Sequence, residues 1–145
     1  MLVLCDTNIL VRLIKSDHEF HASAAAAVSA LQARGHIPAI VPQCCYEFYV
    51  VATRPLERNG LGLSPAQAMR DLDDLLALFR LLRDERSIFK SWKSLVAKHE
   101  VQGRQAHDTR LVAAMQRHGL AELLTFDAKH FTRYDSIRVT TPNAA

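Results

Sequence analysis

The feature that most constrains the fold is an alternation along the chain of short apolar runs and longer segments with helical periodicity. Such runs are typical of strands buried on both faces of a sheet, joined by helices that return the chain so that the strands lie parallel. The apolar runs predict strands at residues 2–5, 37–41, 80–83, 122–125 and 137–140. The periodic segments predict helices at residues 8–15, 21–34, 43–53, 64–79, 88–96 and 107–118, and a helical turn at 127–131. We therefore expect an α/β fold built on a parallel sheet.

Length and composition indicate a single domain spanning residues 1–145. A chain of 145 residues buries roughly 70% of its unfolded surface on folding, which is enough for a hydrophobic core. The sequence contains no internal repeat, low-complexity tract or linker. Its formal net charge of +3 is compatible with a polyanionic partner but does not require one, and a dedicated duplex binder is usually more basic.

The cysteines and the hydropathy pattern favour a cytoplasmic protein without a membrane anchor. Cys5, Cys44 and Cys45 are odd in number, two are adjacent, and all lie in apolar runs, so we expect reduced thiols rather than a disulfide framework. No apolar run approaches the roughly 20 residues that span a bilayer. The run before Asp6 is too short for the apolar region of a signal peptide.

Three aspartates occur where the chain passes between predicted strands and helices. Asp6 and Asp127 each follow an apolar strand, and Asp108 opens a helix after a loop. In open parallel sheets, ligands bind beyond the carboxyl ends of the strands, so these acids are expected to meet in one cleft. Each aspartate alone is equally compatible with a helix cap or with a first-turn acid that favours the helix dipole.

Glu47 favours the functional interpretation. It is the only charged residue in residues 44–52 and lies too far into its predicted helix to act as the cap. A carboxylate on so apolar a helix is expected to be at least partly buried, and an unpaired buried charge is strongly unfavourable. Because no basic residue follows before Arg54, we expect a positive group beside Glu47, and a hard cation shared with the three aspartates would supply it.

The proposed ligand set indicates the metal. Carboxylates with neither cysteine nor histidine point to Mg²⁺ or Mn²⁺ rather than zinc. His18 and His21 are expected to face solvent, and His99-Glu100 lacks a second histidine at the spacing of a metalloprotease helix. The predicted catalytic and metal-binding residues are Asp6, Glu47, Asp108 and Asp127.

At these residues the sequence resembles the PIN-domain nucleases and, within them, the VapC-type toxins of bacterial toxin–antitoxin pairs. The resemblance covers essentially the whole chain. It rests on four segments in a fixed order between the predicted elements: Asp6-Thr7-Asn8, Glu47, Gln105-Ala106-His107-Asp108 and Thr125-Phe126-Asp127.

The resemblance implies a three-layer α/β/α fold with a central, mostly parallel sheet. It also implies an endoribonuclease that cleaves single-stranded RNA with Mg²⁺ or Mn²⁺, forms a homodimer and is blocked by an antitoxin protein. By position, the four acids match the family's acidic cluster, and Asn8 and Thr125 match its supporting polar positions. The fourth acid, matched here by Asp127, varies within the family.

The expected chemistry is metal-assisted phosphodiester hydrolysis, in which a metal-bound water attacks phosphorus and the metal offsets the growing negative charge. Thr125 and Asn8 are expected to orient acids or metal-bound water, and simple turn or cap roles are the alternative for both. Basic residues that flank the acids are candidate RNA contacts: Arg104, Arg110, Lys129 and His130.

Two other functions are compatible with acids gathered at a sheet edge. A phosphoacceptor signalling module would have paired acids after the first strand and a lysine at the end of a late strand, but Asp6 has no adjacent acid and the last strand carries Arg138 instead. A non-catalytic nucleic-acid-binding module is the second alternative, and the presence of all four acids weighs against it.

Overall fold

The computed structural model describes residues 1–142, which contain a five-stranded, fully parallel sheet with the strand order β3-β2-β1-β4-β5. The strands are β1 (Leu2–Cys5), β2 (Ile37–Ile40), β3 (Arg80–Leu81), β4 (Glu122–Leu124) and β5 (Arg138–Thr140). The predicted parallel α/β fold is confirmed. The strand predicted at residues 80–83 is shorter in the structure because its neighbour β2 ends at Ile40. The last hydrogen bond between the two strands runs from the Leu82 N–H to the Ile40 carbonyl oxygen, at 2.8 Å.

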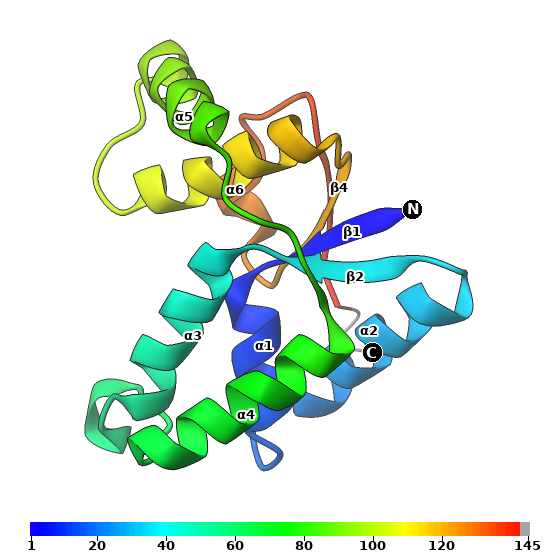
Figure 1. Ribbon diagram of the computed structural model, residues 1–145, viewed down its shortest axis with the longest axis vertical. Coiled ribbons are helices and arrows are strands. Elements are labelled where there is room, and N and C mark those ends of the chain that lie inside the picture. Colours follow the sequence, from blue (N-terminus) through cyan, green and yellow to red (C-terminus); the bar gives the residue numbers. More distant parts are fainter. Residues whose placement is uncertain (143–145) are drawn as a thin grey trace.

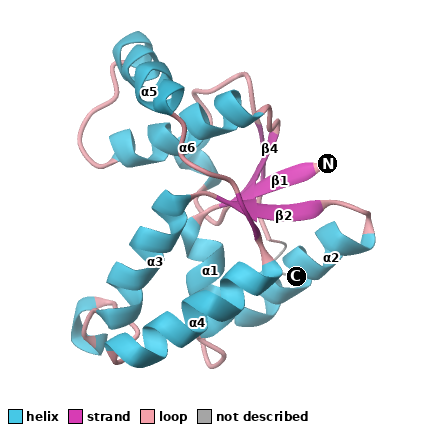
Figure 2. Cartoon of the chain, in the orientation of Figure 1, coloured by secondary structure: helices cyan, strands magenta, loops and turns pink. Residues whose placement is uncertain are grey.

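Residues 1–142 contain six α-helices that cover both faces of the sheet (Figures 1 and 2). One face is covered by α5 and α6, and the other by α1 to α4 (Figure 1). The helices are α1 (Thr7–Ile14), α2 (His21–Ala33), α3 (Pro42–Thr53), α4 (Pro65–Leu78), α5 (Arg86–His99) and α6 (Gln105–His118). This is the expected three-layer arrangement. None of the described helices combines the length and the apolar character that crossing a lipid bilayer requires.

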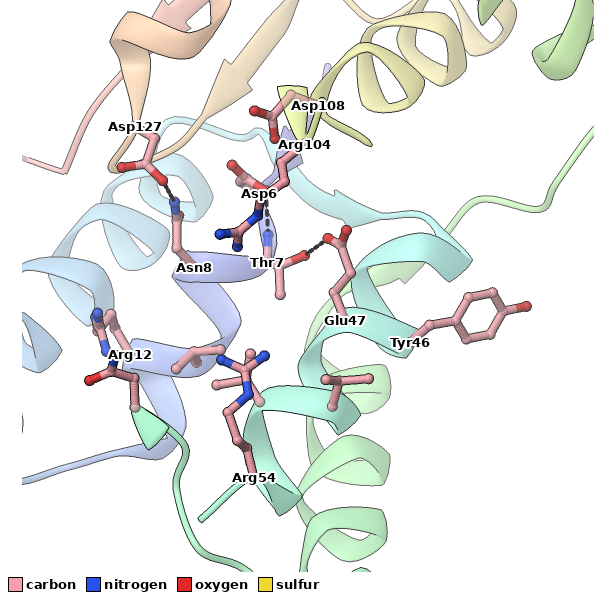
Figure 3. Close-up of a pocket in the computed structure, with 14 residues that line it drawn as sticks. Asp6, Thr7, Asn8, Arg12, Tyr46, Glu47, Arg54, Arg104, Asp108 and Asp127 are labelled. Carbon is pink, nitrogen blue, oxygen red and sulfur yellow. Dashed lines mark hydrogen bonds between the residues drawn. The ribbon is translucent and has the colours of Figure 1, made fainter. Parts of the chain in front are cut away.

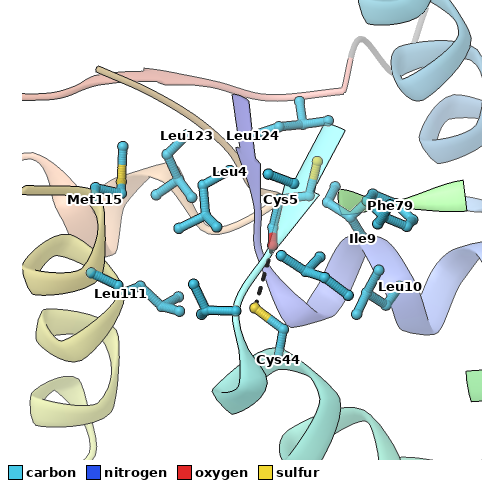
Figure 4. Close-up of a cluster of buried hydrophobic side chains, with 14 of the residues drawn as sticks. Leu4, Cys5, Ile9, Leu10, Cys44, Phe79, Leu111, Met115, Leu123 and Leu124 are labelled. Carbon is cyan, nitrogen blue, oxygen red and sulfur yellow. Dashed lines mark hydrogen bonds between the residues drawn. The ribbon is translucent and has the colours of Figure 1, made fainter. Parts of the chain in front are cut away.

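The central strand β1 is buried on both faces, as its continuous apolar sequence predicts. Leu4 and Cys5 are at most 1% exposed. Leu4 is directed toward Leu111 and Met115 of α6, whereas Cys5 lies on the side of Ile9 in α1 (Figure 4). The three cysteines are free and buried, in agreement with the expected reduced thiols.

The register of the sheet places two polar residues together at its carboxyl edge. Cys5 of β1 pairs with Leu124 of β4, so the residues that follow, Asp6 and Thr125, leave the sheet side by side. The Asp6 N–H continues the ladder by donating to the Leu124 carbonyl at 3.0 Å. The edge where ligands bind in open parallel sheets therefore begins with an acid and a hydroxyl in contact.

Residues 54–63, here called the return loop, fold back onto the C-terminal end of α3. The loop contains the short helix η1 (Leu56–Arg58). Its N–H groups at Leu61, Gly62 and Leu63 donate to the carbonyl oxygens of Val51, Arg54 and Ala52 at 3.0, 2.9 and 2.9 Å. Gly60 passes so close to Arg54 that a Cβ atom there would lie 2.0 Å from the Arg54 carbonyl oxygen. The return loop therefore fixes the backbone of Arg54.

Candidate active site

A cavity of about 610 Å³ lies at the carboxyl edge of the sheet, and all four predicted acids line it (Figure 3). They come from separate parts of the fold. Asp6 precedes α1, Glu47 lies within α3, Asp108 is in the first turn of α6, and Asp127 follows β4. The topology thus brings together carboxylates that are far apart in the sequence.

Asp6 is both a helix cap and part of the cavity wall. Its Oδ1 accepts a hydrogen bond from the Thr7 N–H at 2.7 Å and caps α1. Its Oδ2 accepts one from the Thr125 hydroxyl at 2.8 Å. The side chain is only 7% exposed. The cap role and the place in the cavity, which the sequence presents as alternatives, therefore coexist in one residue.

Thr125 and Asn8 connect Asp6 to Asp127. The buried Thr125 hydroxyl donates to Asp6 and accepts from the Asn8 side-chain amide at 3.2 Å and from the Asp127 N–H at 3.0 Å. The same Asn8 amide donates to Asp127 Oδ2 at 3.2 Å. Asn8 thus contacts Asp127 directly and reaches Asp6 only through Thr125. The two predicted supporting residues hold two of the acids in fixed positions.

Glu47 is bound by neutral groups rather than by a cation. Its carboxylate accepts hydrogen bonds from the Thr7 hydroxyl at 2.8 Å and from the Gln43 side-chain amide at 3.2 Å. Among residues 1–142, no basic side chain forms an ion pair with Glu47. Gln43 also donates to the carbonyl oxygen of His107 at 2.8 Å. This bond ties α3 to the turn of α6 that carries Asp108.

Asp108 pairs with a histidine that follows β4 along the chain. His130 Nδ1 lies 3.4 Å from Asp108 Oδ2, and both side chains are partly exposed. His130 belongs to η2 (Ala128–Phe131), directly after Asp127. The sequence places His130 among the RNA contacts, and its contact with Asp108 adds a second role, that of orienting this acid.

Two of the four carboxylates have raised pKa values. The pKa of Asp6 is raised from its ordinary 3.8 to about 6, chiefly by burial and less by the charges of Asp108 and Glu47, against the lowering effect of the hydrogen bonds from Thr125 and Thr7. Burial also raises the pKa of Asp108, as do Glu47 and Asp127, whereas His130 lowers it. The ionised cavity is therefore electrostatically unfavourable without a compensating positive charge.

The chemistry of the donor set fits a hard divalent cation, although the ligands are not converged. The cavity wall offers carboxylate oxygens, which Mg²⁺ and Mn²⁺ prefer. Within residues 1–142, no three acidic, histidine or cysteine side chains are grouped as a ready set of ligands. The acids instead hold hydrogen bonds with Thr7, Asn8 and Thr125. Metal binding at this cavity therefore requires the acids to move closer together.

The predicted basic contacts have different positions. Arg104 lines the cavity, whereas Arg110 is held by Asp84 at 3.2 Å and by Gln43 at 3.2 Å. Lys129 is exposed and is not one of the residues that line the cavity. Of the four predicted contacts, only Arg104 lines the cavity. His130 does not line it but contacts Asp108, which does.

Two arginines that the sequence analysis did not select line the cavity as well: Arg12 and Arg54. Helical spacing could have identified them. Arg12 is the fourth residue after Asn8 on α1, and Arg54, which directly follows α3, is the seventh after Glu47, so each follows a polar site residue at a helical spacing. They are farther along the helices than the motif residues, which is why a search around the acids misses them.

The phosphoacceptor alternative gains no support from the last strand. Arg138 of β5 binds Glu122 at 2.7 Å, which occupies it away from Asp6. In a phosphoacceptor module a basic group from a late strand would have to reach the acids.

The sequence matches the PIN domain family over residues 3–137. No match was found among curated proteins. Solved structures share the fold: VapBC2 from Rickettsia felis, bound to a promoter DNA fragment, matches with a TM-score of 0.75 at 18% identity, covering 99% of this chain and 100% of the other.

Two further structures agree. A toxin–antitoxin complex from Klebsiella pneumoniae matches with a TM-score of 0.65 at 25% identity, covering 97% of this chain and 98% of the other. VapC20 from Mycobacterium tuberculosis, described as a toxin that cleaves the sarcin–ricin loop, matches with a TM-score of 0.65 at 15% identity, covering 91% of this chain and 95% of the other. The likeness extends over nearly the full length of each chain.

Proposed function

This chain belongs to the PIN domain family, and we propose that it is a divalent-metal-dependent endoribonuclease that cleaves single-stranded RNA as the toxin of a toxin–antitoxin pair. The observation that carries the proposal is the set of four carboxylates, from four separate segments, that line one cavity. A structural role alone does not explain why a fold would gather four acids in one cavity, where the pKa values of Asp6 and Asp108 are raised.

We assign the metal, Mg²⁺ or Mn²⁺, to Asp6, Glu47, Asp108 and Asp127. When bound, it lowers the pKa of a coordinated water and offsets negative charge that develops on the phosphate. Thr125 and Asn8 keep Asp6 and Asp127 oriented toward the cavity. A carboxyl whose pKa is about 6, as for Asp6, is closer to neutral pH than an ordinary aspartate and can therefore exchange a proton with a neighbouring acid or water more readily.

The same cavity also suggests a protein partner. An exposed acidic wall attracts the guanidinium of a protein inhibitor, because arginine pairs well with carboxylates. The toxin–antitoxin complexes from Rickettsia felis and Klebsiella pneumoniae support a cognate antitoxin for this chain. A homodimer is the second proposed assembly, and sedimentation equilibrium of the purified protein tests it.

The decisive experiment is cleavage of a labelled single-stranded RNA, with the same RNA annealed to its complement for comparison. We expect cleavage of the single strand with Mg²⁺ or Mn²⁺ and none in EDTA. Glu47→Gln and Asp108→Asn should each lower the rate more than about 100-fold, because even residues that only support metal ligands contribute 10- to 100-fold. Asp73→Asn, which alters an exposed acid of α4 outside the cavity, is the matched control. Full activity in EDTA, or active Glu47 and Asp108 variants, would refute the assignment.

A further inference from the structure

The cavity has a basic region as well as an acidic one. The guanidinium groups of Arg12 and Arg54 lie at the opposite end of the cavity from Asp6, Asp108 and Asp127 (Figure 3). Catalysis by the acids does not account for these two arginines, and a ligand that occupies the whole cavity meets both charged regions.

Neither arginine has a counter-ion in the structure. Both side chains are partly buried, yet within the described part of the chain neither guanidinium forms an ion pair. By contrast, Arg110 and Arg138 bind Asp84 and Glu122. A charge that has lost part of its hydration without gaining a partner is unfavourable, and the deficit is removed when an anion binds.

The backbone holds both arginines in place. Arg12 lies in the last turn of α1, which packs against α3, and Arg54 is fixed at the end of α3 by the return loop. Asn59 of the same loop also lines the cavity, and its backbone adopts the left-handed conformation with φ 63°. The backbone at both arginines is therefore a fixed part of the cavity wall.

Apolar side chains also line the cavity: Val11, Val50 and Val51. The wall thus offers acidic, apolar and basic groups within one cavity. A nucleic acid strand presents matching groups, since its phosphates are separated by sugars and by bases with apolar faces. If the scissile phosphate of a strand lies at the acids, another phosphate of the same strand lies farther along the cavity, because the two are covalently linked.

We propose that Arg12 and Arg54 form a binding site for a second phosphate of the single-stranded RNA. The inference rests on the proposed function and extends it, because it fixes the direction in which the substrate leaves the acids. Guanidinium groups bind phosphate through paired N–H donors. Such contacts position the strand without reading its bases, so the site contributes affinity to every RNA sequence.

The test measures equilibrium binding of a short fluorescein-labelled oligoribonucleotide of mixed sequence by fluorescence anisotropy. Binding is measured with Mg²⁺ in an Asp6→Asn background, with a gel to verify that the RNA stays intact. Arg12→Gln and Arg54→Gln should each raise Kd about 10-fold, as expected for loss of one charge-assisted contact. Each should also reduce the slope of log Kd against log salt by about 0.7, the value for one phosphate contact on a single strand.

Two controls separate the site from general charge effects. Arg58→Gln removes an exposed arginine of the return loop that does not line the cavity, and it should change Kd less than about 3-fold at the same ionic strength. Arg54→Lys keeps the charge but loses the paired donors, so it should retain the salt slope while raising Kd. Thermal melts of each variant verify folding.

Cleavage kinetics of the active protein give an independent reading. Arg12→Gln and Arg54→Gln should raise KM about 10-fold and change kcat little, because the contact is made equally in the ground state and the transition state. If RNA is cleaved but both variants behave like Arg58→Gln, the phosphate site is refuted and the proposed function stands. If the parent binds RNA through both arginines without cleaving it, the site stands and the nuclease proposal fails. Binding of polyglutamate in place of RNA, with the same dependence on the two arginines, would overturn the site in favour of an acidic protein partner.

Discussion

At the scale of single residues, Asp6 shows how one carboxylate can stabilise the backbone and destabilise the charged cavity together. Its cap on α1 satisfies the Thr7 N–H. Its burial and its acidic neighbours oppose ionisation and raise its pKa to about 6. This rise in pKa corresponds to about 3 kcal/mol of folding free energy that is lost when the group ionises.

The loss of folding free energy on ionisation of Asp6 should appear in the pH dependence of stability in EDTA. The pKa of Asp6 is higher in the folded state, about 6, than its ordinary 3.8, so its neutral form stabilises the fold at low pH and that contribution is lost as the pH rises through about 6. Asp6→Asn cannot ionise. Between about pH 4 and pH 7, the free energy of unfolding of Asp6→Asn relative to the parent should therefore rise by up to about 3 kcal/mol. Urea denaturation at both pH values measures it, and a difference independent of pH would contradict the shifted pKa.

Bound metal should make the parent more stable than Asp6→Asn, which is the reverse of their order expected in EDTA at neutral pH. A ligand that binds only the folded state raises the melting temperature by mass action, so Mg²⁺ or Mn²⁺ should stabilise the parent more than Asp6→Asn, and the variant should lose RNA cleavage. Asparagine is as good a cap as aspartate. If Asp6 served only as a cap, the variant would remain active and metal would affect both proteins equally.

At the scale of elements, the strands could be predicted because burial on both faces demands uninterrupted apolar runs. The residue at which β3 ends could not be predicted, because it depends on where the neighbouring strand β2 ends. The four acids could be located by their places at strand ends and within an apolar helix. Their partners could not: the bond from Thr7 to Glu47 joins residues 40 positions apart, and the contact of His130 with Asp108 depends on how η2 packs on α6.

The close approach of Gly60 to Arg54 in the return loop predicts the effect of a substitution at Gly60. In Gly60→Ala the new Cβ would lie 2.0 Å from the Arg54 carbonyl oxygen, so the loop must shift and displace Arg54. We expect a loss of about 1–3 kcal/mol in unfolding free energy, as for other overpacked sites, together with weaker RNA binding. Gly35→Ala is the control, because its Cβ meets nothing within 4 Å and only its φ of +81° is strained. Gly35→Ala should lose about 1 kcal/mol and bind RNA normally. Equal RNA affinity in the two variants would show that the loop does not position Arg54.

At the scale of the whole molecule, the acidic end of the cavity is where we expect an inhibitor to bind. We predict that the antitoxin inserts a basic side chain near Glu47 or Asp108, since a guanidinium replaces the missing positive charge and excludes the metal. Isothermal titration of Mn²⁺ and anisotropy of labelled RNA, each with the free protein and with the inhibited complex, measure this competition. Normal binding of both metal and RNA by the complex would refute this mode of inhibition.

The bond between Asp6 and Thr125 also has a consequence for synthesis, because it joins positions 119 residues apart. At 5–20 residues per second, a ribosome takes roughly 6 to 24 s to cover that distance. During this interval the nascent chain displays Asp6 without Thr125 or Asp127, and β1 without its neighbour β4. A chain that has not yet reached residue 127 lacks the assembled cavity. For the proposed ribonuclease, the order of translation therefore delays RNA cleavage until residue 127 has been added, and an inhibitor already present has that time to meet the emerging protein.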